Sequence, residues 1–193
     1  MLTLNNDLIE GYEIISPDAF LTKEACQKSC CYVKKRDIPV REFIKPVRNV
    51  VTKDIRLAKV VNSPAEVRDF VVNSLAILGY PHLKVEEHLQ AIAYMIMQRF
   101  NKKQLRCRMD LVYSDKCKSF HVDQVFVRTI TTLHGPGTEL KLKKTGDEIY
   151  KIDTGDTLLV KGSLYPGGND KAFHRSPKIS HLGISRLLFV MDC

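Results

Sequence analysis

The sequence has no hydrophobic run long enough to cross a bilayer. Its longest apolar stretch runs from Ala91 to Met97, far short of the roughly 20 residues that a transmembrane helix needs. The first twenty residues contain Asp7, Glu10 and Glu13 and have neither a basic leader nor an apolar segment, so no secretory signal is indicated. We therefore expect a soluble, cytoplasmic protein with no membrane partner.

The spacing typical of zinc fingers and zinc ribbons is also missing. Such sites need two close pairs of cysteine or histidine, and no such pairs are formed by the six cysteines, Cys26, Cys30, Cys31, Cys107, Cys117 and Cys193. Because nothing indicates export, free intracellular thiols are favoured over disulfides. A chain of 193 residues buries enough apolar surface to fold without a structural metal, so a metal site here would serve function rather than folding.

The positive charge is not concentrated as it is in a nucleic-acid-binding groove. The formal net charge is +8, yet only Lys34 to Arg36 and Lys141 to Lys144 form basic clusters, and no aromatic residues interleave them. Scattered basic residues are typical of solvated faces. Nucleic-acid binding is therefore an alternative that the charge permits but does not favour.

Internal repeats, low-complexity segments and long Pro/Gly/Ser-rich linkers are absent from the sequence, which predicts a single domain over residues 1–193. Residues 1–104 are predicted to be mainly helical. The three helices expected there follow Asp37 and Pro39, run from Ser63 to Gly79, and cover about Val85 to Asn101. In the second, Ser63 is the N-cap, Pro64 the first helical residue and Glu66 the capping-box partner.

From Leu105 onward the hydrophobic period changes to two, which is typical of strands with one buried face. The strands expected are Leu105–Tyr113, Val125–Leu133, Glu148–Ile152, Thr157–Val160 and Arg186–Met191. Glycine-containing turns such as Gly135-Pro136-Gly137 separate them. The pattern predicts an α+β fold in which residues 105–193 form a sandwich or barrel and the N-terminal helices pack outside it.

A histidine and an aspartate two residues apart, His121 and Asp123, lie just ahead of the β segment Val125–Leu133. On a strand they would point to the same face, where they supply two of the three ligands of a 2-His-1-carboxylate Fe(II) site. The candidates for the second histidine are His82, His88, His134, His174 and His181. His174 reaches His121 only if the sheet closes or stacks on itself. Alone, the pair favours a surface histidine beside a capping aspartate, because chance pairs of this kind are common.

Further motifs follow this pair in order: R-x-x-T-x-L from Arg128, a glycine turn followed by Thr138, G-D before an apolar strand, His174, and Gly183 with Arg186 leading into the last strand. This order resembles the Fe(II)/2-oxoglutarate-dependent dioxygenases, with a layout most similar to the prolyl-4-hydroxylase-like branch. The phrases F-H-V-D, G-P-G-T-E and H-R-S-P are also similar to an uncharacterised bacterial domain family of unknown function. The matching motifs lie between Leu105 and Asp192, less than half of the chain.

The resemblance implies a double-stranded β-helix, a jelly-roll or cupin-like barrel whose mouth holds the metal. The Fe(II) ligands that it implies are His121, Asp123 and His174. It further implies that Arg186 binds the distal carboxylate of 2-oxoglutarate, for which a planar guanidinium is well suited. Arg128 and Thr131 are additional candidates for contacting this co-substrate, and Arg128 is equally compatible with pairing to Asp123.

The activity that the resemblance implies couples the decarboxylation of 2-oxoglutarate to succinate and CO2 with the oxidation of a substrate C–H bond. The substrate, a small molecule or a protein, is not indicated. Two alternatives use other features. The same His/Asp/His set would also bind Zn²⁺, which leaves a non-enzymatic metal-binding barrel in homeostasis or sensing as an alternative. The charge of +8 motivates a nucleic-acid-binding or nucleic-acid-modifying protein.

Overall fold

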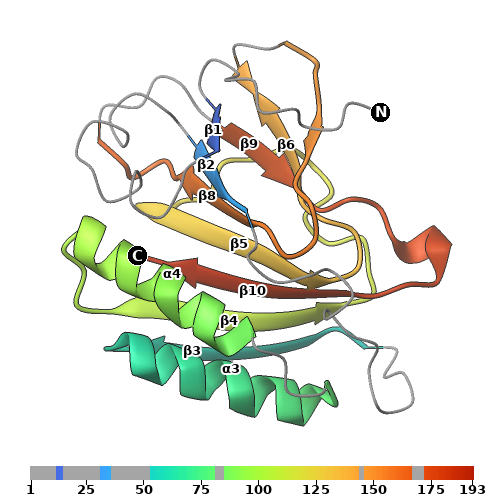
Figure 1. Cartoon of the computed structure of the whole chain (residues 1–193). Helices are drawn as coiled ribbons and strands as arrows, with labels where there is room; N and C mark the ends of the chain where they lie inside the picture. Colours follow the sequence, from blue (N-terminus) through green and yellow to red (C-terminus); the bar gives the residue numbers. More distant parts are fainter. Residues whose placement is uncertain (1–11, 15–30, 36–52, 81–84, 144–145, 167–171) are drawn as a thin grey trace.

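The computed structural model describes residues 12–14, 31–35, 53–80, 85–143, 146–166 and 172–193. These residues form two β-sheets and two α-helices, an α+β fold (Figure 1). No helix in these ranges is long and apolar enough to span a membrane.

The larger sheet has seven strands in the order β1-β2-β8-β5-β10-β4-β3. Their bounds are β1 Tyr12–Ile14, β2 Cys31–Lys34, β3 Ile55–Val61, β4 Leu105–Val112, β5 Val127–His134, β8 Thr157–Lys161 and β10 Arg186–Asp192. The smaller sheet has the order β7-β6-β9, with β7 Tyr150–Lys151, β6 Glu139–Leu142 and β9 Ala172–Arg175. The pairs are antiparallel, except that β1 and β2 are parallel. From β5 onward the chain passes twice from the larger sheet to the smaller one and back, first through β6 and β7 to β8 and then through β9 to β10, as the predicted double-stranded β-helix requires.

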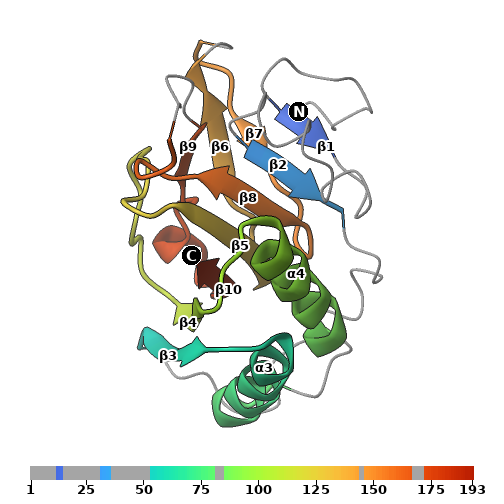
Figure 2. The ribbon, with the colours of Figure 1, turned by 90° about the vertical axis from the view of Figure 1, so that its left-hand side faces the viewer.

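Helices α3 (Pro64–Leu78) and α4 (Val85–Arg99) cover the outer face of the larger sheet (Figure 2). The start of α3 is as predicted, because the hydroxyl of Ser63 accepts a hydrogen bond from the backbone N–H of Glu66 at 3.2 Å. The left-handed Gly79 ends the helix. The ring centroids of Phe70 in α3 and Phe189 in β10 lie 6.3 Å apart, which anchors the helix layer to the centre of the sheet.

Alternate side chains of strand β10 lie on the two faces of the larger sheet. Leu187, Phe189 and Met191 belong to the core beneath the helices, whereas Leu188 and Val190 face the interior between the sheets. Because successive strand residues point to opposite faces, Arg186 is also directed to that interior, where it lines a cavity.

The structure differs from the expectations in several segments. Residues 1–104, expected to be mainly helical, also supply β1, β2 and β3 to the larger sheet. Strand β3 lacked a sequence signal because it is an edge strand whose residues are mostly partly or fully exposed, so its apolar residues do not alternate. Strands β6 and β9 are further strands beyond those expected. The helix expected after Asp37 lies outside the described residues.

Candidate metal centre

His121, Asp123 and His174 lie together between the two sheets, with potential ligand atoms all within 4.8 Å of one another. A single antiparallel β-bridge produces this meeting. The N–H of His121 donates to the carbonyl of His174 at 3.1 Å, and the N–H of His174 donates back at 3.0 Å. His174 belongs to β9, whereas the His121 segment forms only this bridge instead of the predicted strand. The sheet therefore does fold back as the motif required.

The histidine nitrogens converge on the Asp123 carboxylate. Nε2 of His121 lies 3.5 Å from Oδ1 of Asp123, and Nε2 of His174 lies 2.9 Å from Oδ2. Nδ1 of His121 is 2.9 Å from the carbonyl oxygen of Ser119. Since a carbonyl only accepts, Nδ1 carries a proton, and Nε2 is the nitrogen that faces the carboxylate.

Two buried polar atoms in this group lack a hydrogen-bond partner among the described residues: Oδ2 of Asp123 and Nδ1 of His174. Oδ2 is close to His174, but the contact does not have hydrogen-bond geometry. A buried acceptor without a partner is costly, and a divalent cation between the three side chains would satisfy it. The donor set of two imidazoles and one carboxylate is chemically suited to Fe(II) or Zn²⁺. The residues present therefore fit a metal ion.

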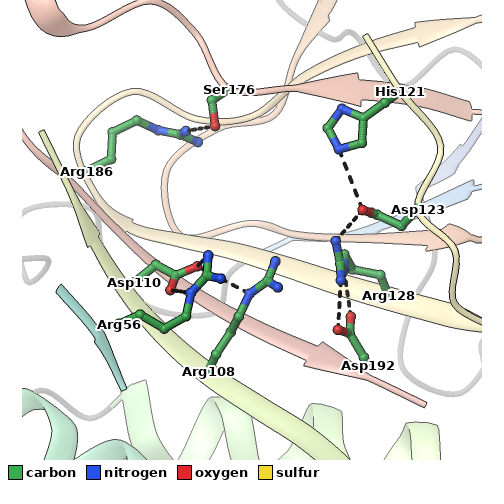
Figure 3. A network of polar contacts seen from close by, with 9 residues as sticks. All are labelled: Arg56, Arg108, Asp110, His121, Asp123, Arg128, Ser176, Arg186 and Asp192. Carbon is green, nitrogen blue, oxygen red and sulfur yellow. Dashed lines mark hydrogen bonds and ion pairs between the residues drawn. The ribbon is translucent and has the colours of Figure 1, made fainter. Parts of the chain in front are cut away.

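Arg128 holds the carboxylate of Asp123 from the side. Its Nη1 forms an ion pair with Oδ1 of Asp123, while its Nε and Nη2 donate to the two oxygens of Asp192 at 2.6 and 2.7 Å (Figure 3). Burial acts to raise the pKa of Asp123, but contact with His174 and the positive charges of His174, Arg128 and His121 outweigh it and lower the pKa to about 2. Asp123 is therefore ionised at neutral pH, which is the state that binds metal.

The backbone of Asp123 is fixed by the segment after β8. The carbonyl of Asp123 accepts a hydrogen bond from the N–H of Ser163 at 2.8 Å. A Cβ on Gly162 would lie 2.0 Å from the carbonyl oxygen of Val125. Only glycine allows this approach, so Gly162 keeps Asp123 in place.

Arg186 is a buried cation without a carboxylate partner among the described residues. Its exposed fraction is 1%. Nε donates to the carbonyl of Pro136 at 2.7 Å, Nη1 to the hydroxyl of Ser176 at 2.7 Å, and Nη2 to that of Thr138 at 3.4 Å. Burial lowers its pKa to about 10, partly offset by Cys117 and Glu139. A charged guanidinium whose hydrogen-bond partners in the described part of the chain are all neutral is suited to bind an anion.

The Gly-Pro-Gly turn between β5 and β6 positions Arg186. Gly135 has a φ of +81°, and a Cβ there would lie 2.3 Å from the carbonyl oxygen of Ser185 and 3.1 Å from Cα of Arg186. Gly137 packs even more closely, because a Cβ there would lie 1.6 Å from the carbonyl oxygen of Ile152. The turn thus approaches the start of β10 closely enough for the Pro136 carbonyl to accept the Arg186 hydrogen bond.

Arg186, His121 and His174 line one cavity, which opens to solvent and has a free volume of about 90 Å³. Its apolar wall consists of Val112, Ile130, Leu188 and Val190. The arrangement places a metal-binding group and an anion-binding group in one small compartment. A ligand with a chelating end and a distal carboxylate has the matching chemistry.

The structure brings five of the six expected site residues to this centre: His121, Asp123, Arg128, His174 and Arg186. Thr131 does not reach it. It lies on the opposite face of β5 from Arg128 and Ile130, and its hydroxyl is 2.7 Å from that of Thr157. The sequence prediction did not include Ser176 and Thr138, whose hydroxyl groups accept hydrogen bonds from Arg186. Both residues belong to motifs that the sequence contains, Ser176 to H-R-S-P and Thr138 to G-P-G-T.

The fold matches solved structures of dioxygenases. A dioxygenase for auxin oxidation from rice is 16% identical, with a TM-score of 0.55 over 91% of this chain and 76% of that chain. Dioxygenase for auxin oxidation 1 from Arabidopsis thaliana, in a binary complex with 2-oxoglutarate, is 12% identical, with a TM-score of 0.52 over 93% of this chain and 91% of that chain. At these identities the likeness is one of fold, that of the 2-oxoglutarate oxygenases.

The family is established by the sequence itself. The model of the DUF1826 family, described as protein of unknown function, matches residues 39–192, and the chain belongs to this family. No curated protein matches the sequence.

Proposed function

We propose that the protein is an Fe(II)- and 2-oxoglutarate-dependent oxygenase. The observation that carries the proposal is the buried Arg186, which has no carboxylate partner among the described residues and lines the same cavity as His121 and His174 of the metal group. A protein that only stores or senses a metal has no need for a buried cation beside it. The fold of the 2-oxoglutarate oxygenases adds support.

In this proposal His121, Asp123 and His174 would hold Fe(II), for which two imidazoles and one carboxylate are a suitable donor set. Arg186 takes the distal carboxylate of 2-oxoglutarate, with Ser176 and Thr138 orienting its guanidinium. Bound Fe(II) and 2-oxoglutarate together supply the oxidising chemistry that activates O2 for attack on a C–H bond.

The proposal is tested by adding Fe(II) and 2-oxoglutarate to the protein without oxygen and recording the visible metal-to-ligand charge-transfer band. We expect the band in the wild type and its loss in His174→Ala. Arg186→Met should retain metal binding but need at least about tenfold more 2-oxoglutarate, because a charged partner of the carboxylate is lost. His181→Ala, an exposed histidine in the 3₁₀ turn Ser180–Leu182, is the matched control and should keep the band.

The same titration separates the oxygenase from a protein that binds metal alone. Tight Zn²⁺ or Fe(II) binding that depends on His174, with no effect of 2-oxoglutarate at saturation, would favour a metal-binding barrel. The absence of the band in the wild type would end the oxygenase proposal.

A further inference from the structure

The cavity has more basic side chains than the described carboxylates balance. Six basic residues line it: Arg56, Arg108, Lys116, Arg128, Arg175 and Arg186. Five carboxylates pair with them in the described structure: Asp54, Asp110, Asp123, Asp192 and Glu139. One positive charge is therefore in excess. A divalent metal and doubly charged 2-oxoglutarate cancel each other, so the excess persists in the loaded site.

The salt bridges of the basic residues show where in the cavity the excess positive charge lies. Lys116 and Arg175 each have one carboxylate partner, and Arg186 is assigned to 2-oxoglutarate in the proposed function. Arg128 has two carboxylates, of which Asp123 belongs to the metal group. The remaining excess lies where two guanidinium groups, those of Arg56 and Arg108, share the single carboxylate of Asp110.

Asp110 is used mainly by Arg56. Nε and Nη2 of Arg56 donate to the two carboxylate oxygens at 2.6 and 3.1 Å, a bidentate pair. Nε of Arg108 lies 3.2 Å from Oδ2 of Asp110, but this buried atom has no hydrogen-bond partner in the described part of the chain. The guanidinium of Arg108 is thus close to a carboxylate without being satisfied by it.

The position of Arg108 suits a second ligand. In Figure 3 its guanidinium points into the space bounded by Arg186 and Ser176 on one side and by His121 and Asp123 on the other. Its side chain is 23% exposed, while that of Arg56 is 61% exposed at the rim. The apolar wall of Ile130, Leu188 and Val190 lines the same cavity.

We propose that Arg108, with Arg56 at the rim, binds the carboxylate of a small organic acid that is the substrate of this site. The inference rests on the proposed function. One excess charge matches one carboxylate, a planar guanidinium pairs with a carboxylate in a bidentate fashion, and the apolar wall fits a hydrocarbon body. Arg108 is separate from the anion site at Arg186 in Figure 3, so the two carboxylates have different partners.

The test measures binding, by calorimetry, to protein loaded with Mn(II) and 2-oxoglutarate. The probes are butyrate, benzoate and phenylacetate, each beside its uncharged amide, and inorganic phosphate. We expect at least one carboxylate to bind and its amide to bind at least about tenfold more weakly. Equal binding of acids and amides, no binding of any acid, or tighter binding of phosphate would overturn the assignment.

Variants test whether Arg108 is responsible for binding the carboxylate. Arg108→Met should weaken the carboxylate at least about tenfold and leave 2-oxoglutarate binding unchanged, which also reports that the variant is folded. Asp110→Asn should strengthen binding of the added carboxylate, because the Asp110 carboxylate no longer competes with it for Arg108. Arg106→Met, an exposed position two residues away on β4, is the matched control. If Arg108→Met fails to fold, Arg56→Gln replaces it and should weaken binding, because Asp110 then turns to Arg108.

The outcomes separate the two proposals. Binding of 2-oxoglutarate with no carboxylate binding would overturn this inference and leave the oxygenase proposal standing. Carboxylate binding that depends on Arg108 in a protein that ignores 2-oxoglutarate would support the anion site and overturn the oxygenase proposal.

Discussion

At the scale of single residues, the metal group depends on a cation that is not itself a ligand. Arg128 in β5 forms an ion pair with Asp123. It also donates two hydrogen bonds to Asp192, its cross-strand partner in β10. Asp192 therefore fixes the plane of the guanidinium, and the guanidinium fixes the orientation of Asp123. Such outer partners orient metal ligands and influence metal affinity strongly.

We expect Arg128→Met to lower the affinity for Mn(II) by about 10- to 100-fold, because Asp123 loses its orienting partner and faces Asp192 without a cation between them. Calorimetric titration of the apoprotein with Mn(II) measures the change. Arg175→Met is the control: Arg175 also lines the cavity but pairs with Glu139, so its removal changes the local charge equally. Equal losses in the two variants would mean that general charge, not orientation, is responsible.

At the scale of elements, the turn between β5 and β6 connects sheet geometry to anion binding. Gly135 and Gly137 allow the turn to contact the start of β10 and the Ile152 carbonyl. This contact delivers the Pro136 carbonyl and the Thr138 hydroxyl to Arg186. The Gly-Pro-Gly motif is therefore part of the support for the buried guanidinium as well as a chain reversal.

Gly135→Ala should destabilise the protein by more than its backbone cost, which is about 1–2 kcal/mol for a left-handed residue that is not glycine. The additional cost comes from the clash of the new Cβ with the Ser185 carbonyl. Gly146→Ala is the matched control, since Gly146 also has a positive φ, +67°, but nothing lies within 4 Å of its would-be Cβ. Urea unfolding measures both variants. Equal losses would show that the close packing of this turn contributes nothing.

At the scale of the whole molecule, the sequence predicted the fold class better than the site's details. Alternating strands such as Leu105–Val112 gave clear signals because one face is buried, and the double-stranded β-helix is confirmed. The pairing of Arg56 with Asp110 was not predictable. It joins strand β3, an edge strand without an apolar pattern, to β4, and cross-strand pairing depends on register that local sequence does not encode.

Two further carboxylates connect distant parts of the molecule near the cavity. Asp54, at the start of β3, accepts hydrogen bonds from Tyr113 and Ser114 after β4. Asp115 accepts them from the Ile179 and Ser180 backbone and from the Ser180 hydroxyl. The segment after β4 is thereby connected both to the edge of the larger sheet that β3 forms and to the chain that leads into β10.

Acid should release both ties. Burial acts to raise the pKa of Asp54, but hydrogen bonds from Lys116, Ser114 and Tyr113 outweigh it and hold the pKa well below its usual range. Hydrogen bonds from Ser180 and Ile179 lower the pKa of Asp115 to about 2. Because each folded-state pKa lies below the unfolded value of about 3.9, the stability that these groups add is fully present above that value and is lost as the pH falls toward 2.

We therefore expect the thermal unfolding midpoint of the wild type to decrease as the pH is lowered from about 5 to about 2. The Asp54→Asn/Asp115→Asn double variant should start lower at pH 7 and fall less, so that the two curves converge at the acid end. The reason is that an amide lacks the charge that strengthens these hydrogen bonds at neutral pH. Asp69→Asn, at an exposed position on α3, should follow the wild-type curve. A double variant whose curve runs parallel to the wild type down to pH 2 would assign acid sensitivity to other groups.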